Sequence, residues 1–256
     1  MHTRARDIAD WMKARVTAAG SRGIVVGLSG GIDSAVVVGL AAAAMPGRVV
    51  GVMMPCHSDP QDEHDARVAA DHFRVPAIRI DLAPAYDRLL ADLGQALAQL
   101  PGGQAPALST DEVDPKQKLP IANVKPRLRM ASLYFVANTL DYLVAGTGNR
   151  SELTIGYFTK YGDGGVDMLP IGRLLKSEVR AIARELGVPA AIIEKPPSAG
   201  LWAGQTDEGE MGFTYADLEN YLTRGPAAVP PAVALRIERL ARASEHKRAL
   251  PPMPEE

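Results

Sequence analysis

The sequence predicts an α/β protein with an open parallel sheet and helices on both faces. Short, continuous apolar runs at residues 24–28, 48–53, 77–82 and 142–145 are typical of strands buried on both faces. Stretches with helical periodicity separate these runs, and strands that alternate with helices form βαβ units. The chain has 256 residues, of which 46% are apolar and 23% charged. We therefore expect one continuous domain that spans residues 1–256.

Helical spacing of apolar residues predicts the elements between the strands. The expected helices span residues 4–18, 33–45, 62–73, 85–100, 121–140, 176–186, 215–222 and 232–244. In the first of them, Ile8, Trp11, Met12 and Val16 form one apolar stripe that would face the core. Residues 101–120 are rich in Pro and Gly, and we expect a long loop there.

Composition and charge exclude several classes of protein. Lys and Arg total 28 against 30 Asp and Glu, and the net charge of −2 argues against a broadly basic nucleic-acid-binding protein. Cys56 is the single cysteine, which excludes an internal disulfide framework and favours a reducing compartment. The charged N-terminus lacks the apolar segment of a secretory signal, and the longest apolar run, Ala35–Met45, is too short to span a bilayer. We expect a cytoplasmic protein that binds neither nucleic acid nor membrane.

A glycine-rich turn, Gly27-Leu28-Ser29-Gly30-Gly31-Ile32-Asp33-Ser34, connects the first strand to a helix. A Walker A loop needs lysine where Asp33 stands, and the dinucleotide-binding pattern needs glycine where Ser29 stands. Residues 27–31 also fit the G-x-S-x-G nucleophile elbow, with Ser29 as the nucleophile. This strand is the first in the chain, however, so no upstream loop could supply the second oxyanion donor. The remaining interpretation is S-G-G-x-D-S, the loop of the ATP pyrophosphatases.

The chemistry of this turn suits a pyrophosphate group. Its two adjacent glycines expose successive backbone N–H groups, and the following helix adds its positive N-terminal end. Two serine hydroxyls are further donors. Asp33 would be repelled by phosphate unless a hard cation lay between them, so its presence predicts Mg²⁺. The turn at residues 146–149 would open at the same edge of the sheet, where ligands of open α/β sheets bind.

Further segments resemble one family. They are residues 123–130 (NVKPRLRM), 146–147 (GT), 151–152 (SE), 156–167 (GYFTKYGDGGVD), 195–202 (KPPSAGLW) and 245–248 (EHKR). Together with the glycine-rich turn they resemble the ammonia-dependent NAD synthetases, over residues 27–248. The turn alone would indicate only the wider ATP pyrophosphatase superfamily, which has a Rossmann-like, adenine-nucleotide α-hydrolase-like fold and includes GMP synthetase, asparagine synthetase and tRNA-thiolating enzymes.

The resemblance implies a ligase that carries out the last step of NAD biosynthesis. The nicotinate carboxylate of deamido-NAD⁺ attacks the α-phosphate of ATP, and pyrophosphate leaves. Ammonia then converts the adenylated intermediate into NAD⁺ and AMP. The family also implies a homodimer with deamido-NAD⁺ at the subunit interface, and we expect no glutaminase domain in this chain.

The resemblance also implies roles for individual residues. The expected ATP ligands are the turn from Gly27 to Ser34 together with Thr147, Lys176 and Ser198. The expected Mg²⁺ ligands are Asp33 and Glu152. The residues expected to bind deamido-NAD⁺ are Arg127, Lys160, Asp167, His246 and Lys247. The expected catalytic residues are Asp33, Lys176 and Asp163, the last beside the ammonia site, where an anion would favour NH₄⁺ and help to remove a proton.

The chain departs from the family pattern at residues 146–152. Many bacterial members have G-T-D-H-A-A-E there, whereas this chain has G-T-G-N-R-S-E. The spacing to Glu152 is retained, so its expected metal role is retained too. Ser198 replaces a frequent threonine and keeps the hydroxyl.

Two alternative functions have the same nucleotide-binding turn. An RNA-thiolating enzyme usually needs catalytic cysteines or a basic RNA-binding face, and one cysteine with a net charge of −2 argues against both. A non-catalytic nucleotide sensor would not need Glu152, Lys176 and Lys160 in addition to the turn.

Overall fold

A parallel β-sheet forms the centre of the computed structural model, which describes residues 3–101, 115–202 and 204–254. In this part of the chain the strands are β1 (Gly23–Leu28), β2 (Val49–Met53), β3 (Ala77–Arg79) and β4 (Tyr142–Ala145). Their order is β3-β2-β1-β4, and every pair is parallel. Ile24 of β1, for example, pairs with Val49 on one side and Leu143 on the other. The predicted open parallel sheet is confirmed.

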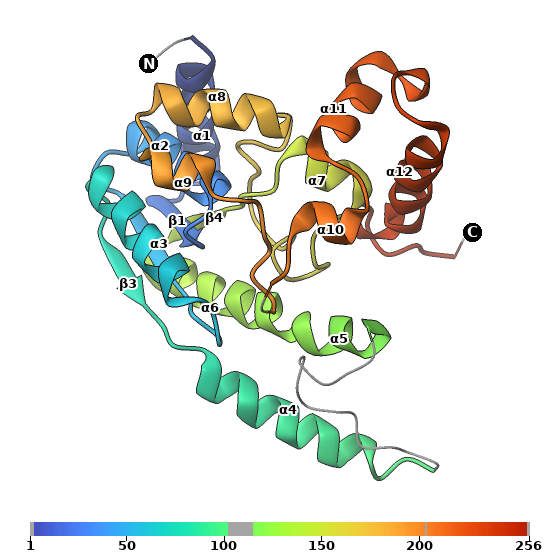
Figure 1. The fold of residues 1–256 in the computed structure, drawn as a ribbon. Coiled ribbons are helices and arrows are strands. Elements are labelled where there is room, and N and C mark those ends of the chain that lie inside the picture. The colour runs from blue at the N-terminus through green and yellow to red at the C-terminus, as the bar shows by residue number, and fades with distance from the viewer. Residues whose placement is uncertain (1–2, 102–114, 203, 255–256) are drawn as a thin grey trace.

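Helices cover both faces of the sheet (Figure 1). One face carries α1 (Thr3–Ala18), α2 (Ile32–Ala44), α3 (Pro60–His72), α8 (Lys176–Glu185) and α9 (Ala190–Glu194). The other face carries α4 (Ala83–Leu97), α5 (Pro115–Ala122) and α6 (Val124–Leu140). β1 supplies side chains to both layers, because Ile24, Val26 and Leu28 join the first core and Val25 joins the second. Burial of each such side chain is worth about 1.5–3 kcal/mol, which explains the continuous apolar run.

The C-terminal third builds a smaller core of its own. It consists of α7 (Arg150–Ile155), α10 (Asp207–Met211), α11 (Tyr215–Arg224) and α12 (Pro231–Ala243), with short 3₁₀ turns at Pro226–Ala228 and Glu245–Lys247. The buried side chains are Ile155, Met211, Phe213, Tyr215, Leu218 and Ile237. Figure 1 shows this group beside the sheet rather than on either of its faces. A cleft lies between the two parts.

Several predicted boundaries were wrong. The strand expected at 77–82 ends at Arg79, because β2 ends at Met53 and Asp81 already accepts a hydrogen bond from the N–H of Ala83 in α4. The helix expected at 121–140 is divided into α5 and α6. Pro126 lies in the first turn of α6, where a residue without an N–H is tolerated.

The prediction of a long loop at residues 101–120 was wrong for residues 115–120, which belong to α5. Residues 102–114 lie outside the described part of the chain. The short helices α7, α9 and α10 were not predicted, since five or six residues are too few to show a period. Trp11 was expected in the core but is 41% exposed. None of the helices in the described ranges has the length and apolar character needed to cross a membrane.

Candidate active site

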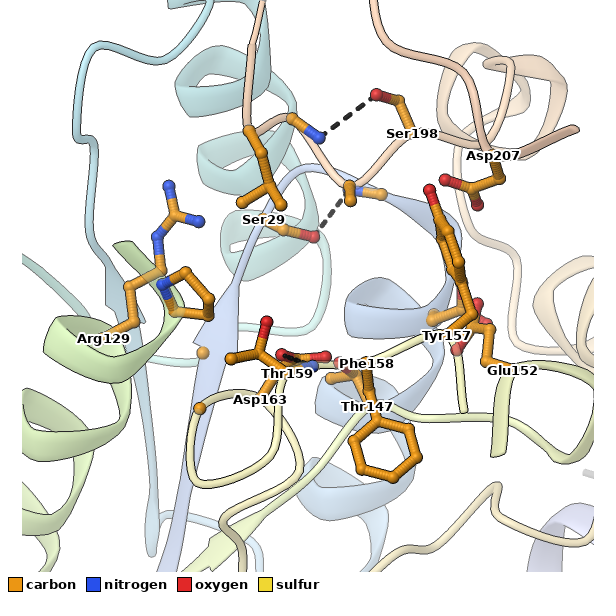
Figure 2. A pocket seen from close by; sticks show the side chains of 18 of the residues that line it. Ser29, Arg129, Thr147, Glu152, Tyr157, Phe158, Thr159, Asp163, Ser198 and Asp207 are labelled. Carbon is orange, nitrogen blue, oxygen red and sulfur yellow. Dashed lines mark hydrogen bonds between the residues drawn. The ribbon is translucent and has the colours of Figure 1, made fainter. Parts of the chain in front are cut away.

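A cleft of about 1220 Å³ opens at the carboxyl ends of the strands (Figure 2). It contains most of the residues predicted for ATP and metal binding, namely Gly27, Leu28, Ser29, Gly31, Ile32, Asp33, Thr147, Glu152, Lys176 and Ser198. Asp163 and Lys247 also line it. Gly30 and Ser34 belong to the same turn but do not contribute to the cleft wall. The structure therefore brings together residues that lie far apart in the sequence.

The glycine-rich turn is held in shape by its own side chains. The Ser34 hydroxyl donates to the Gly31 carbonyl at 2.9 Å, and the Gly31 N–H donates to the Ser29 hydroxyl at 3.2 Å. Gly30 has a φ of +77°, and a Cβ atom at this position would clash with the carbonyl oxygen of Asp62. α2 follows without a side-chain cap at its N-terminus. Its first N–H groups are therefore free of side-chain acceptors, as an anion site requires.

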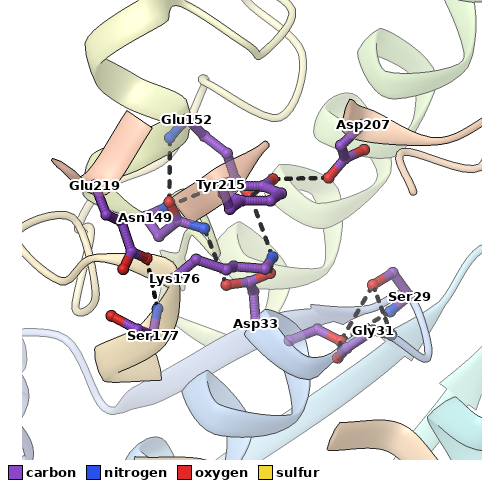
Figure 3. Close-up of polar contacts among 11 residues, drawn as sticks. Ser29, Gly31, Asp33, Asn149, Glu152, Lys176, Ser177, Asp207, Tyr215 and Glu219 are labelled. Carbon is purple, nitrogen blue, oxygen red and sulfur yellow. Dashed lines mark hydrogen bonds and ion pairs between the residues drawn. The ribbon is translucent and has the colours of Figure 1, made fainter. Parts of the chain in front are cut away.

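A charged cluster lies at the start of α2 (Figure 3). Lys176 Nζ forms a short ion pair with Asp33 Oδ2 and lies 3.5 Å from Glu152 Oε1. The Asn149 side-chain amide donates to Asp33 Oδ1 at 3.2 Å. The Tyr215 hydroxyl donates to Asp207 Oδ2 at 2.8 Å and lies 3.4 Å from Glu152 Oε1. Asp33, Asn149 and Glu152 lie at the starts of the helices that follow β1 and β4, as the sheet topology predicts.

Burial and like charge set the protonation of this cluster. Burial, together with the charge of Asp33, raises the pKa of Glu152 well above its usual range. Burial alone would lower the pKa of Lys176, but the carboxylates of Asp33 and Glu152 outweigh it and raise that pKa. The ammonium group of Lys176 thus faces the carboxylates of Asp33 and Glu152, which repel each other. A further cation would therefore stabilise these two carboxylates together.

The donor set fits a hard divalent cation that is shared with a phosphate. In the described residues no group of three or more His, Cys, Asp or Glu side chains is arranged to hold a metal ion. Mg²⁺ is commonly bound by one or two carboxylates, with substrate phosphates and water completing its shell. Asp33 and Glu152, next to the phosphate-type turn, match that mode.

The N-terminus of α8 orients Lys176. Glu178 in the first turn of α8 accepts a hydrogen bond from the Leu175 N–H at 2.7 Å and a 2.6 Å ion pair from Arg4 of α1. Lys176 is 2% exposed. Its position is therefore fixed by a helix cap and by burial.

A third carboxylate of the site, Asp163, lies in the loop between α7 and α8. Its Oδ1 accepts a hydrogen bond from the Thr159 N–H at 2.9 Å. Burial raises the pKa of Asp163, against the opposing charges of Lys247 and Arg129. Lys247 holds the same loop, because its Nζ donates to the carbonyls of Gly156 and Phe158 at 2.9 and 2.8 Å. Asp163 is thus a buried carboxylate that borders the cleft.

Comparison with known proteins agrees with this geometry. The family model for NAD synthase matches residues 4–251. The chain belongs to this family. It is 48% identical over 247 residues to the NH(3)-dependent NAD(+) synthetase of Carboxydothermus hydrogenoformans, covering 96% of this chain and 95% of that one.

Two solved structures of related proteins have the same fold. The NMN synthetase of Francisella tularensis superposes with a TM-score of 0.86 at 35% identity, covering 98% of this chain and 97% of that one. The NAD+ synthetase of Burkholderia pseudomallei gives a TM-score of 0.73 at 33% identity, covering 97% and 90%. The predicted family and fold are therefore confirmed.

Three residues predicted to bind deamido-NAD⁺ in this NAD synthase chain are near one another but do not line the cleft. The Arg127 guanidinium donates to the Lys160 carbonyl at 3.4 Å, and Lys160 Nζ donates to the His246 carbonyl at 2.6 Å. Arg127, Lys160 and His246 therefore form a separate group beside the cleft.

Asp167 is the fourth residue that was predicted to bind deamido-NAD⁺ but does not line the cleft. It lies beside the edge strand β4. Its carboxylate accepts hydrogen bonds from the Tyr134 hydroxyl at 2.9 Å and from the Val144 N–H at 2.7 Å. These bonds tie the loop after α7 to α6 and β4. Within this chain Asp167 therefore has a structural role.

Two polar residues of the site in this NAD synthase family member were not predicted, Lys195 in the cleft wall and Asn149 beside Asp33. Lys195 pairs with Asp62 at 2.8 Å and with Asp65 at 2.5 Å, and thereby fastens the segment that carries Ser198 to α3. Its partners lie 130 or more residues away in the sequence, so no local pattern could reveal the pairs. Asn149 lies in the segment that departs from the family pattern, and its contact with Asp33 was likewise not foreseen.

Proposed function

We propose that this protein makes NAD⁺ from deamido-NAD⁺, ATP and ammonia. The observation that carries this proposal is the convergence of three features in one cleft: a phosphate-type turn, the carboxylates of Asp33 and Glu152, and the buried carboxylate of Asp163. Relatives at 48% and 45% identity over 96% of the chain have the name NH(3)-dependent NAD(+) synthetase. This name supports ammonia rather than glutamine as the nitrogen donor.

The adenylation half of the reaction uses the turn and the charged cluster. Backbone N–H groups of the turn and of the start of α2 that have no acceptor within the turn bind the phosphates of ATP, with Thr147, Lys176 and Ser198 as further donors. Asp33 and Glu152 hold Mg²⁺, which when bound supplies positive charge to the departing pyrophosphate. Lys176 adds a fixed cation to the same side, and preorganised charge of this kind stabilises a transition state without reorganisation.

The amidation half of the reaction uses Asp163. Its negative charge attracts NH₄⁺, and its carboxylate takes up the proton that must leave before ammonia can attack. The raised pKa of Asp163 suits this step, because a base is most effective when its pKa approaches the working pH.

The active form is a homodimer with deamido-NAD⁺ at the subunit interface. Leu89, Leu93 and Leu97 form an exposed apolar stripe on α4, and Phe135 on α6 is 74% exposed. Apolar surface of this extent on a water-facing helix is typical of an interaction site. The deamido-NAD⁺ ligands would then be Arg127, Lys160, Asp167, His246 and Lys247. Asp167 would act there in addition to its bonds within the chain.

The chain has one further feature that bears on its organisation and location, the single cysteine Cys56. Residues 1–256 act as one synthetase domain without a glutaminase part, and the protein works in the cytoplasm, where a lone thiol such as Cys56 stays reduced.

A second candidate function is the same amidation on a mononucleotide. The TM-score of 0.86 with a structure named NMN synthetase favours it. The chemistry would be unchanged, and only the group attached to the nicotinate ribose would differ.

The decisive experiment supplies the purified protein with ATP and Mg²⁺ and one of two acceptors, deamido-NAD⁺ or nicotinate mononucleotide. Each acceptor is combined with NH₄Cl or with glutamine, and the products are separated by chromatography. NAD⁺ from deamido-NAD⁺ with NH₄Cl is the expected result. Faster conversion of the mononucleotide would establish the second candidate. Pyrophosphate release with neither product would contradict both substrate assignments.

A further inference from the structure

Arg129 is a cation of the cleft that has no carboxylate partner. It projects from α6 and lines the cleft (Figure 2). Its Nε donates to the Met54 carbonyl at 3.2 Å and its Nη2 donates to the Ser58 hydroxyl at 3.3 Å. No carboxylate oxygen of the described residues lies within 4.0 Å of its guanidinium. Lys176 and Lys195, in contrast, each pair with two carboxylates.

The charge of Arg129 is costly in the free protein. Burial lowers the pKa of Arg129, and the distant charges of Asp163 and Asp62 offset this only in part. Arginine nevertheless stays protonated, because its ordinary pKa lies far above neutrality. A partly buried cation without a counter-ion destabilises a fold. Such a residue is expected where an anionic ligand completes the pairing.

The donors of Arg129 that remain free suit a phosphate group. An arginine has five N–H groups, and the two that are engaged by Met54 and Ser58 fix the plane of the guanidinium. The other N–H groups have no acceptor among the described residues. A fixed guanidinium fork binds two oxygens of one phosphate side by side, which an ammonium group cannot do.

The position of Arg129 identifies the phosphate. On one side Arg129 is fixed to the end of β2, the neighbour of β1 and its phosphate-type turn. On the other side is Asp163, whose charge acts on Arg129. The bond that ammonia breaks joins the nicotinate carbonyl to the α-phosphate. That phosphate must therefore lie between the turn and Asp163.

We propose that Arg129 binds the α-phosphate of ATP and of the adenylated intermediate, an inference that rests on the proposed function. In the first step a nicotinate carboxylate oxygen forms a bond to the α-phosphorus, and the bond to the bridging oxygen breaks as pyrophosphate leaves with the electron pair. In the second step the ammonia nitrogen bonds to the carbonyl carbon, the carbon–oxygen bond breaks, AMP leaves with the electron pair, and the nitrogen gives up a proton, for which Asp163 is the acceptor. Negative charge builds up on the α-phosphate oxygens in the transition state of the first step, and it builds up again in the second step as AMP takes the bonding electron pair, so Arg129 would serve both.

The first test measures binding of AMP and of adenosine by calorimetry, because the two differ only in the α-phosphate. In the wild type AMP should bind more tightly than adenosine. Arg129→Met should reduce this preference about tenfold or more, since a charge-assisted hydrogen bond is worth roughly 1.5–3 kcal/mol, while adenosine binds as before. Arg129→Lys should retain part of the preference. Arg88→Met is the matched control, because the Arg88 side chain is 80% exposed on α4. An unchanged preference in Arg129→Met would overturn the proposal.

The second test separates a ligand role from a structural one. Without ligands, the melting temperature of Arg129→Met should equal or exceed that of the wild type, because an unpaired charge is removed. A structural role predicts a lower melting temperature instead. Exchange of labelled pyrophosphate into ATP, which reports the adenylation step, should fall by roughly two orders of magnitude.

The outcomes also separate this proposal from the proposed function. If the wild type makes NAD⁺ and Arg129→Met keeps both its exchange rate and its AMP preference, only the assignment of Arg129 fails. If the wild type makes neither NAD⁺ nor the amidated mononucleotide but Arg129→Met loses the AMP preference, the substrate assignment fails. Arg129 then stands as the ligand of the adenylate phosphate.

Discussion

Asp33 has a different partner on each of its carboxylate oxygens. Oδ2 pairs with the ammonium group of Lys176, and Oδ1 accepts from the amide of Asn149. The side chain is therefore fixed at the N-terminal end of α2, beside the turn that would bind phosphate. At the level of the single residue, this fixed negative charge is what distinguishes the site from an ordinary anion-binding loop.

Replacing Asp33 by asparagine should abolish Mg²⁺-dependent turnover while the fold stays intact. The amide keeps the shape but removes the charge that a divalent ion needs, and a loss of several kcal/mol corresponds to roughly three orders of magnitude in kcat. Steady-state NAD⁺ formation over a range of Mg²⁺ concentrations measures it, and circular dichroism checks the fold. Asp10→Asn, on the exposed side of α1, is the control. Near wild-type activity of Asp33→Asn would remove Asp33 from the metal site.

Gly30 should not tolerate a side chain. Its φ is +77°, and a Cβ atom would clash with the Asp62 carbonyl oxygen, so Gly30→Ala should lower the free energy of unfolding by about 2 kcal/mol or more. The shift of the turn should also weaken ATP binding. Gly47→Ala separates the two causes, since Gly47 has a φ of +72° with nothing within 4 Å. Urea unfolding measures the stability of both variants. If Gly30→Ala and Gly47→Ala lose the same stability, the clash with Asp62 of α3 contributes nothing and the positive φ explains the whole loss.

At the scale of elements, the cap of α8 links stability to the site. Burial would raise the pKa of Glu178, but the hydrogen bond from the Leu175 N–H and the guanidinium of Arg4 outweigh burial and lower it. A carboxyl group with a lowered pKa in the folded state stabilises the protein above its unfolded pKa. That contribution is lost as the pH falls through the folded pKa.

Glu178→Ala should therefore lower the free energy of unfolding by about 1 kcal/mol at pH 7, the usual cost of a lost cap. Glu178→Gln keeps an acceptor for the Leu175 N–H, so its difference from the wild type reports the charge alone. That difference should shrink as the pH falls below the ordinary glutamate pKa of 4.5. Urea unfolding across this range provides the measurement. A difference that stays constant with pH would show that the charge of Glu178 contributes nothing.

The sequence predicted elements with a continuous signal better than elements whose ends depend on a neighbour. The apolar runs of β1 and β4 and the periodic stripe of α8 are confirmed within a residue or two, because each signal is continuous over the whole element. β3 extends over only three residues and ends where its partner strand ends. That boundary depends on β2, not on the residues of β3 themselves.

At the scale of the whole molecule, the cleft is formed by two cores. The sheet and its helices supply the turn and Asp33, whereas Ile155 and Met211 of the C-terminal core line the cleft, and Tyr215 of that core lies 3.4 Å from Glu152. The turn could be predicted because its residues are contiguous. Pairs such as Lys195 with Asp65 could not, because their members are 130 residues apart in the sequence and only the packing of the fold brings them together. The metal role of Asp33 was predicted from the chemistry of the turn, whereas the assignments of Glu152 and Lys176 came from family resemblance.

The exposed leucine stripe of α4 predicts the state of assembly. Leu89, Leu93 and Leu97 recur every fourth residue and are 38%, 44% and 45% exposed. The wild type should be a dimer in analytical ultracentrifugation, and Leu93→Asp with Leu97→Asp should give monomers, since a buried unpaired carboxylate is strongly unfavourable. The monomers should also lose affinity for deamido-NAD⁺.

The control for this variant is Leu250→Asp, since Leu250 is 84% exposed near the C-terminal end. A wild type that sediments as a monomer at micromolar concentration would contradict the assignment of the stripe to an interface.

Glu152 serves two purposes with one side chain. Its Oε2 accepts from the Asn149 N–H at the start of α7, and its Oε1 faces Lys176. Aspartate would be too short to reach both, and glutamine would keep the cap but lose the charge. No substitution at residue 152 therefore keeps both the cap of α7 and the negative charge beside Lys176. In evolutionary terms, such double use narrows the substitutions that selection can accept at residue 152.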